Sequence, residues 1–187
     1  MSSKTSAYTL IELLCSLAIL AVLLNLAIPA YSNLVEHHQA QIVIEQLERA
    51  ISITRHTAIN EGTMTTLCKS ADGRTCGGQW QQGYIVFTDN NGDRLINGSD
   101  RLVQVFKGQH DIGTLTFRAF QNKQYLQMTA EGFTNYQNGN FTFCPASQKA
   151  EQAEQLIINR SGRTYRAKDR DGDGIKEGAN GKPLVCE

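Results

Sequence analysis

Apolar residues are concentrated in one run near the start of the chain. The sequence is almost unbroken in apolar character from Leu10 to Ala30, about the 20 residues that a membrane-spanning helix needs. The pattern predicts one long helix that continues to residue 60 and ends at Gly62, with a kink or a loosened turn at Pro29. Its second half is amphipathic, because apolar side chains recur there at helical spacing: Val35, Ala40, Val43, Leu47, Ala50, Ile51, Thr54 and Ala58.

Short runs with β-strand character follow Gly62, separated by turn residues. Asn-Gly pairs at 91–92, 97–98 and 138–139 are typical of tight turns between antiparallel strands. The expected fold class is therefore α+β, with antiparallel sheets packed against the amphipathic half of the helix. The predicted strands are 63–69, 83–88, 102–106, 114–117, 125–128, 140–143 and 155–159.

Composition adds little to this organisation. The chain has 187 residues, enough for about one domain plus an appendage, and its formal net charge is zero. Nucleic-acid binding would therefore need a local basic patch. An enzyme is not expected, since no Ser or Cys lies in a recognisable nucleophile turn and the four histidines lack metal-ligand spacing. No cofactor is implied.

Four of the five cysteines lie in the polar part of the chain, while Cys15 lies in the apolar run. An even set predicts two disulfides and an oxidising compartment, with packed reduced thiols as the alternative. Cys68 and Cys76 are close in sequence and have a turn between them, which leaves Cys144 to pair with Cys186.

Glu12 is the residue that a plain membrane anchor does not explain. A carboxylate near the head of an apolar run is costly in a bilayer unless something neutralises it. The sequence A-Y-T-L-I-E-L-L around it resembles the leader junction of type IV prepilins, although the family usually has Gly where this chain has Ala7. The resemblance implies cleavage between Ala7 and Tyr8 by prepilin peptidase, and N-methylation of Tyr8. Cleavage would create an amine on Tyr8 that can neutralise Glu12 of a neighbouring subunit.

A second resemblance narrows the family. The segment T-L-C-K-S-A-D-G-R-T-C-G-G-Q-W-Q-Q-G-Y-I-V-F-T-D-N-N-G-D at 66–93 is similar to the signature of the GspH/FimT/FimU minor pilins. So are E-G-F at 131–133, F-T-F-C-P at 141–145 and I-I-N-R-S-G-R at 157–163. The resemblance implies the type IV pilin fold, with two small antiparallel sheets on the helix, and a place at or near a filament tip.

The two resemblances together divide the chain into four parts. Residues 1–7 are a leader, 8–31 a transmembrane and filament-core helix, 32–167 the amphipathic helix with its β domain, and 168–187 a loop-like tail. The implied function is a minor pilin that helps initiate or cap a type IV pilus together with other major and minor pilins. The implied location is the inner membrane, single-pass with the domain in the periplasm, and then the pilus or pseudopilus. A minor pseudopilin of a type II secretion system and a DNA-uptake pilin are the alternatives.

DNA binding and calcium binding each have a candidate site near the end of the chain. Some FimT-like pilins bind DNA through G-R-x-R, but here the second arginine comes one residue later, so Arg163 and Arg166 fall on opposite faces of a strand. Asp169, Asp171 and Asp173 resemble the start of a calcium loop, with Gly174 in sixth place, yet the twelfth residue, Asn180, is not the usual Glu. A weaker version follows Asp89, with Arg94 where the Gly should be. Solvated turns and a solvated strand are the preferred interpretations at all these places, with DNA and calcium as alternatives.

Overall fold

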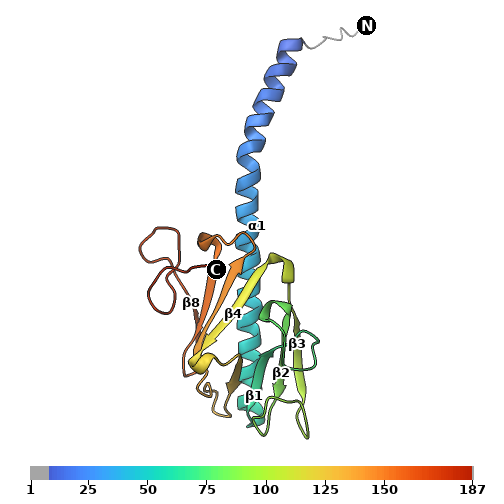
Figure 1. Ribbon diagram of the computed structural model, residues 1–187, viewed down its shortest axis with the longest axis vertical. Helices are drawn as coiled ribbons and strands as arrows, with labels where there is room; N and C mark the ends of the chain where they lie inside the picture. The colour runs from blue at the N-terminus through green and yellow to red at the C-terminus, as the bar shows by residue number, and fades with distance from the viewer. Residues whose placement is uncertain (1–8, 187) are drawn as a thin grey trace, which may run out of the picture. The chain divides into compact units, whose positions relative to one another are not determined.

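The computed structural model describes residues 9–186, apart from the side chain of His110. In this part of the chain one long helix precedes eight strands and four short 3-10 helices (Figure 1). The chain divides into two units, Met1–Val35 and Glu36–Glu187. The elements are α1 Leu10–Glu61, β1 Thr65–Lys69, η1 Trp80–Gln82, β2 Gly83–Thr88, β3 Leu102–Lys107, η2 His110–Ile112, β4 Gly113–Ala119, η3 Phe120–Asn122, β5 Tyr125–Met128, β6 Gly139–Pro145, η4 Ala150–Gln152, β7 Glu154–Ile158 and β8 Thr164–Arg166.

The first unit holds the apolar half of α1. Its large apolar side chains are exposed on every side of the helix, from 49% at Leu24 to 77% at Leu10. The helix continues through Pro29, whose carbonyl accepts a hydrogen bond from the Ser32 hydroxyl at 3.0 Å. This half therefore has no buried face within its own unit.

The second half of α1 belongs to the second unit and is buried along one face. This half ends as predicted, because Gly62 adopts a φ of 62° and Thr63 donates its N–H back to the carbonyl of Ala58 at 3.2 Å. The buried face consists of Ala40, Ile44, Leu47, Ala50, Ile51, Thr54 and Ala58.

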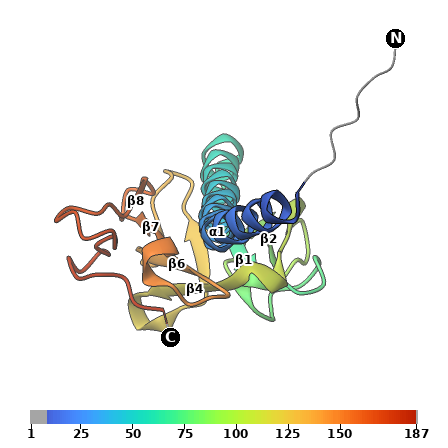
Figure 2. The same ribbon diagram turned by 90° about the horizontal axis from the view of Figure 1, so that it is seen from above.

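Two four-stranded antiparallel sheets pack beside this half of the helix (Figure 2). Their strand orders are β3-β2-β1-β5 and β4-β6-β7-β8. An aromatic cluster joins the sheets, because Trp80 precedes β2 and meets Phe141 of β6 with ring centroids 4.8 Å apart. Phe141 in turn stacks on Phe117 of β4 at 4.1 Å. The α+β fold class predicted from the sequence is confirmed.

All seven predicted strands are present, with their ends shifted by two residues or fewer. The sequence analysis does not predict β8. This strand has only three residues and pairs at the sheet edge with β7, joining Leu156 to Arg166 and Ile158 to Thr164. Residues 168–186 have no regular element but are docked on the second sheet, where Cys186 is bonded to Cys144 of β6. Figure 1 shows loops of this tail extending past the β8 edge.

Candidate functional site

The head of helix α1 is the first candidate site. The predicted cleavage and methylation residues, Ala7 and Tyr8, lie outside the described residues. Glu12 is exposed, and its carboxylate accepts hydrogen bonds from the Thr9 backbone at 2.8 Å and the Thr9 hydroxyl at 3.0 Å. The Thr9 hydroxyl accepts a further bond from the Glu12 N–H at 3.3 Å.

These three bonds form a capping box around the first helical turn. The carboxylate also lies near the positive end of the helix dipole. Sequence reasoning missed this local role of Glu12, although the Thr-x-x-Glu pattern at 9–12 is its usual signal. Glu12 therefore has a function within one chain in addition to the one expected between subunits, and an experiment has to separate the two.

The apolar surface behind Glu12 is long enough to cross a membrane. Among the described residues, α1 is the one helix with a window of sufficient length and apolar composition, and none of that window is buried. A helix that is apolar on all sides is stable only when surrounded by lipid or by other apolar helices. This segment is thus a surface for an apolar environment outside the chain.

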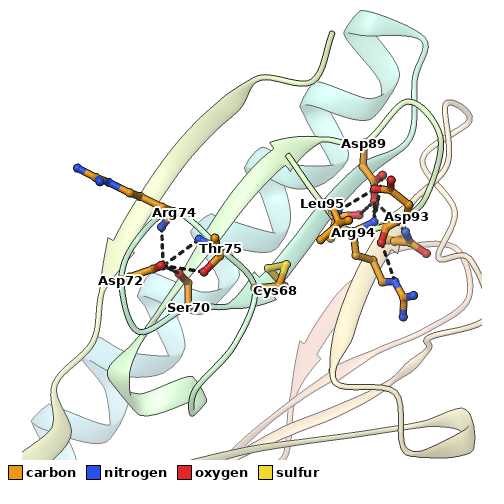
Figure 3. The surroundings of a disulfide bond; sticks show 12 residues. Cys68, Ser70, Asp72, Arg74, Thr75, Asp89, Asp93, Arg94 and Leu95 are labelled. Atoms are coloured by element: carbon orange, nitrogen blue, oxygen red, sulfur yellow. Dashed lines mark hydrogen bonds between the residues drawn. A yellow bond between two sulfur atoms is a disulfide. The ribbon is translucent and has the colours of Figure 1, made fainter. Parts of the chain in front are cut away.

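The structure pairs Cys68 with Cys76 and Cys144 with Cys186, the pairing expected from the sequence. Asp72 organises the first of these loops (Figure 3). Its carboxylate accepts bonds from the backbone N–H groups of Thr75 and Arg74, both at 2.8 Å. These hydrogen bonds lower the pKa of the Asp72 carboxyl, so the loop is held by an ionised side chain at neutral pH.

The two candidate DNA-binding arginines have different surroundings. Arg163 is exposed and follows a turn. Arg166 is half-buried and forms a two-bond ion pair with Glu48 of α1, at 2.9 Å from Nε and 2.7 Å from an Nη. Hydrogen bonding to Glu48 raises the pKa of Arg166. One of the two arginines is therefore engaged in holding β8 to the helix.

The predicted acidic loop, which begins at Asp169, brings its aspartates together and adds a fourth carboxylate, that of Glu177. The structure brings carboxylate oxygens of Asp169, Asp171, Asp173 and Glu177 within 4.8 Å of one another. Backbone N–H groups of Gly172 and Gly174 lower the pKa of the Asp169 carboxyl by hydrogen bonding to it. Sequence reasoning missed Glu177 because it looked for the closing residue at the twelfth position.

The weaker loop after Asp89 is built differently. Asp89 is fully buried, and its carboxylate accepts hydrogen bonds from the Thr66 hydroxyl at 2.6 Å and the Gln127 amide at 3.0 Å. Figure 3 shows it beside Asp93 and Arg94. Its carboxylate is thus satisfied by neighbouring strands.

Comparison with known proteins identifies the family. The family model described as "Type II transport protein GspH" matches residues 43–162. The chain belongs to this GspH family. The model of the prokaryotic N-terminal methylation motif matches residues 2–24 of the same GspH-family chain, which covers the segment around Glu12. No curated protein sequence matches the chain.

Solved structures show the same fold at low sequence identity. The type IV minor pilin FimU of Pseudomonas aeruginosa is similar in two crystal forms, each 18% identical. The TM-scores are 0.52 and 0.53, with 68% and 81% of this chain and 92% and 98% of FimU covered. The minor pseudopilin EpsH of the Vibrio cholerae type 2 secretion system is 10% identical, with a TM-score of 0.45 over 68% of this chain and 94% of EpsH. The FimU comparison confirms the pilin fold expected for a GspH-family chain.

Proposed function

We propose that this GspH-family chain is a minor pilin that helps to initiate or cap a type IV pilus. The observation that carries the proposal is the first half of α1, an apolar helix exposed on all sides and headed by Glu12. The methylation motif covers the same segment. A surface of this kind suits both a bilayer and the core of a helical filament.

The proposed route begins in the inner membrane, with the domain in the periplasm. Two disulfides support an oxidising compartment for the domain. Prepilin peptidase cleaves between Ala7 and Tyr8, which removes Lys4 and leaves an amine on Tyr8 that is then methylated. The apolar half of α1 stays in the membrane until other pilins take it into the filament.

Glu12 has a defined part in this route. In the filament, the amine of Tyr8 on a neighbouring subunit pairs with the Glu12 carboxylate and fixes the axial register between the two helices. Within the single chain the same carboxylate caps the helix. The role of the protein is structural rather than catalytic, since the proposed chemistry ends with the leader peptidase.

A gene deletion, complemented with the intact chain, tests the proposal. Surface pili are counted by electron microscopy, and the sheared pilus fraction is probed with an antibody against the domain. We expect few or no pili in the deletion strain, restoration by the intact chain, and the protein itself in small amounts in sheared pili. Normal piliation of the deletion strain would overturn the proposal.

A minor pseudopilin of a type II secretion system is the second candidate, and the family description "Type II transport protein GspH" favours it. The same deletion strain separates the two functions when its secreted enzymes are measured in parallel. Lost pili with normal secretion supports the pilus function, whereas normal pili with lost secretion supports the pseudopilin. The genes adjacent to this one give an independent check.

A further inference from the structure

The C-terminal tail contains a cluster of carboxylates that no ion pair among the described residues neutralises. Carboxylate oxygens of Asp169, Asp171, Asp173 and Glu177 lie within 4.8 Å of one another. Within residues 9–186, none of the ion pairs involves any of these four groups. The nearby Lys176 amine instead lies 3.3 Å from buried Glu154. Like charges at such short range repel, and a bound cation would remove the repulsion.

Glu177 is the member of the cluster that points to a ligand. It is only 7% exposed, in contrast to the three exposed aspartates. Bridges to Lys168 and Pro183 fix its backbone, and its Oε2 accepts the Arg170 N–H at 2.7 Å. Its Oε1 is buried and has no hydrogen-bond partner in the described part of the chain, and one oxygen of the same carboxylate lies within 4.8 Å of the aspartate oxygens. Leaving a buried carboxylate oxygen unsatisfied is costly, so the position is suited to an oxygen-seeking ion.

The loop backbone holds the aspartates in the pattern that calcium uses. Asp169, Asp171 and Asp173 occupy the first, third and fifth positions, and Gly174 makes the sharp turn at the sixth with a φ of 90°. The hydrogen bonds of Gly172 and Gly174 to Asp169 use one lone pair on each of its oxygens. The remaining lone pairs stay available to an ion.

We propose that this loop binds a calcium ion through Asp169, Asp171, Asp173 and Glu177. Glu177 stands at the ninth position and supplies directly the carboxylate that a standard loop has at the twelfth. Calcium accepts an irregular set of six to eight oxygens, whereas magnesium requires a near-ideal octahedron. A set of four carboxylates at irregular positions in one loop therefore favours calcium over magnesium.

The loop after Asp89 provides an internal reference with a similar backbone. Arg94 has a positive φ of 67° at the position of Gly174. In this loop, however, the third and ninth residues are Asn91 and Asn97, and their amide groups donate to Asp93 at 2.9 and 2.8 Å. In the loop after Asp89, asparagine donors thus stabilise the Asp93 carboxylate, as a cation would stabilise the carboxylates of the tail loop. The carboxylates of Asp89, Asp93 and Asp100 also lie within 4.8 Å of one another, but a side-chain donor already contacts each of them, so the site is assigned to the acidic loop of the tail.

The consequence of calcium binding is a firmly docked tail. Ile175, within the loop, packs against a small core that includes Ala153, Ala167 and Leu184. The disulfide partner Cys144 belongs to the same core. Calcium would therefore stabilise the surface that the tail presents on the second sheet.

Calorimetric titration of the mature full-length chain in detergent micelles tests the proposal. We expect saturable calcium binding with a Kd of about 0.1–1 mM, typical of extracellular modules. Calcium should also raise the thermal unfolding midpoint, and a chelator should reverse the rise. Magnesium at the same concentration should give a much smaller shift.

Three variants assign the signal to the loop. Asp171→Asn and Glu177→Gln should each weaken binding at least about tenfold, since even outer partners of metal ligands contribute that much. Asp93→Asn, in the reference loop, should bind like the unaltered chain. Asp171 is exposed, so its substitution tests the site even if Glu177→Gln does not fold. No saturable binding, an equal response to magnesium, or loss of binding in Asp93→Asn alone would overturn the proposal.

Discussion

The two halves of helix α1 are both rich in apolar residues, but only the second half buries them within the chain. The second half is amphipathic, and its apolar face packs against the two sheets of its own chain. The first half is apolar on all sides, and in the single chain its side chains are exposed. The difference shows which part of one continuous helix stabilises the domain and which part is available for lipid or other subunits.

The largest expected effect concerns the head of the first half. Glu12→Val should nearly abolish incorporation into sheared filaments while leaving membrane insertion and domain stability unchanged. The reason is that an apolar head still enters lipid, whereas the pair with the Tyr8 amine of the next subunit is lost. Immunoblots of the sheared and membrane fractions measure incorporation and insertion, and denaturant titration in detergent measures the stability of the domain.

Glu12→Gln is the matched control for the capping box. Glutamine keeps the hydrogen bonds to Thr9 but removes the charge. If the charge pair matters, Glu12→Gln should fail in assembly as Glu12→Val does. Normal assembly of Glu12→Gln together with failure of Glu12→Val would reduce the role of Glu12 to helix capping.

The same substitution made on each half sharpens the comparison further. Leu47 is fully buried in the domain core, so Leu47→Ala should lower the free energy of unfolding of the domain by about 2–5 kcal/mol. Leu20 is 51% exposed, so Leu20→Ala should change it by less than about 0.5 kcal/mol. Denaturant titration of both variants in detergent, followed by the fluorescence of Trp80, gives the two values. Equal losses would contradict the division of the helix.

The stability of the domain should also depend on how far each disulfide reaches along the chain. Cys144 and Cys186 are 42 residues apart, and loss of their bond should cost roughly 4 kcal/mol. Cys68 and Cys76 are 8 apart, and loss of theirs should cost about 2.5 kcal/mol. Paired Cys→Ser variants compared in the same denaturant titration test the order, and the reverse order would contradict this account.

Much of this architecture could be predicted from local sequence signals. The helix end at Gly62 follows from a residue that tolerates a positive φ, and the strands follow from short apolar runs between Asn-Gly turns. β8 could not be predicted, because three residues in a basic run have no alternating pattern and form a strand only when β7 is beside them.

The candidate sites also include some that the sequence predicts and some that depend on contacts between distant residues. Glu12 and the Cys68–Cys76 pair could be found from their neighbours in the sequence, and Cys144 and Cys186 were then the two cysteines left to pair. The pair between Arg166 and Glu48 could not, since 118 residues separate them. Glu177 was missed because it stands at the ninth rather than the twelfth position of the loop, and its burial depends on the docking of the tail.

A smaller effect is expected where the polar side of the second half meets β8. Arg166→Gln removes the ion pair with Glu48. The side chain of Arg166 is 34% exposed and that of Glu48 is 32% exposed. Solvent screens a pair of that exposure, so the free energy of unfolding should fall by only about 0.5–1 kcal/mol. A double-mutant cycle with Glu48→Gln isolates the pair. A coupling near zero would show that the contact does not stabilise β8.

The smallest expected effect is on duplex DNA. The chain should bind it weakly or not at all at physiological salt, because Glu48 engages Arg166 and the aspartates of the tail repel phosphate. A phosphate-binding patch would instead show affinity that falls steeply with salt, with a log–log slope of about −0.9 per phosphate neutralised. Fluorescence titration at two salt concentrations, with Arg163→Gln and Arg166→Gln beside the unaltered chain, distinguishes these cases. Micromolar binding that is lost in both variants would show that the second half of α1 does not hold Arg166 away from ligands, and would favour a DNA-uptake pilin.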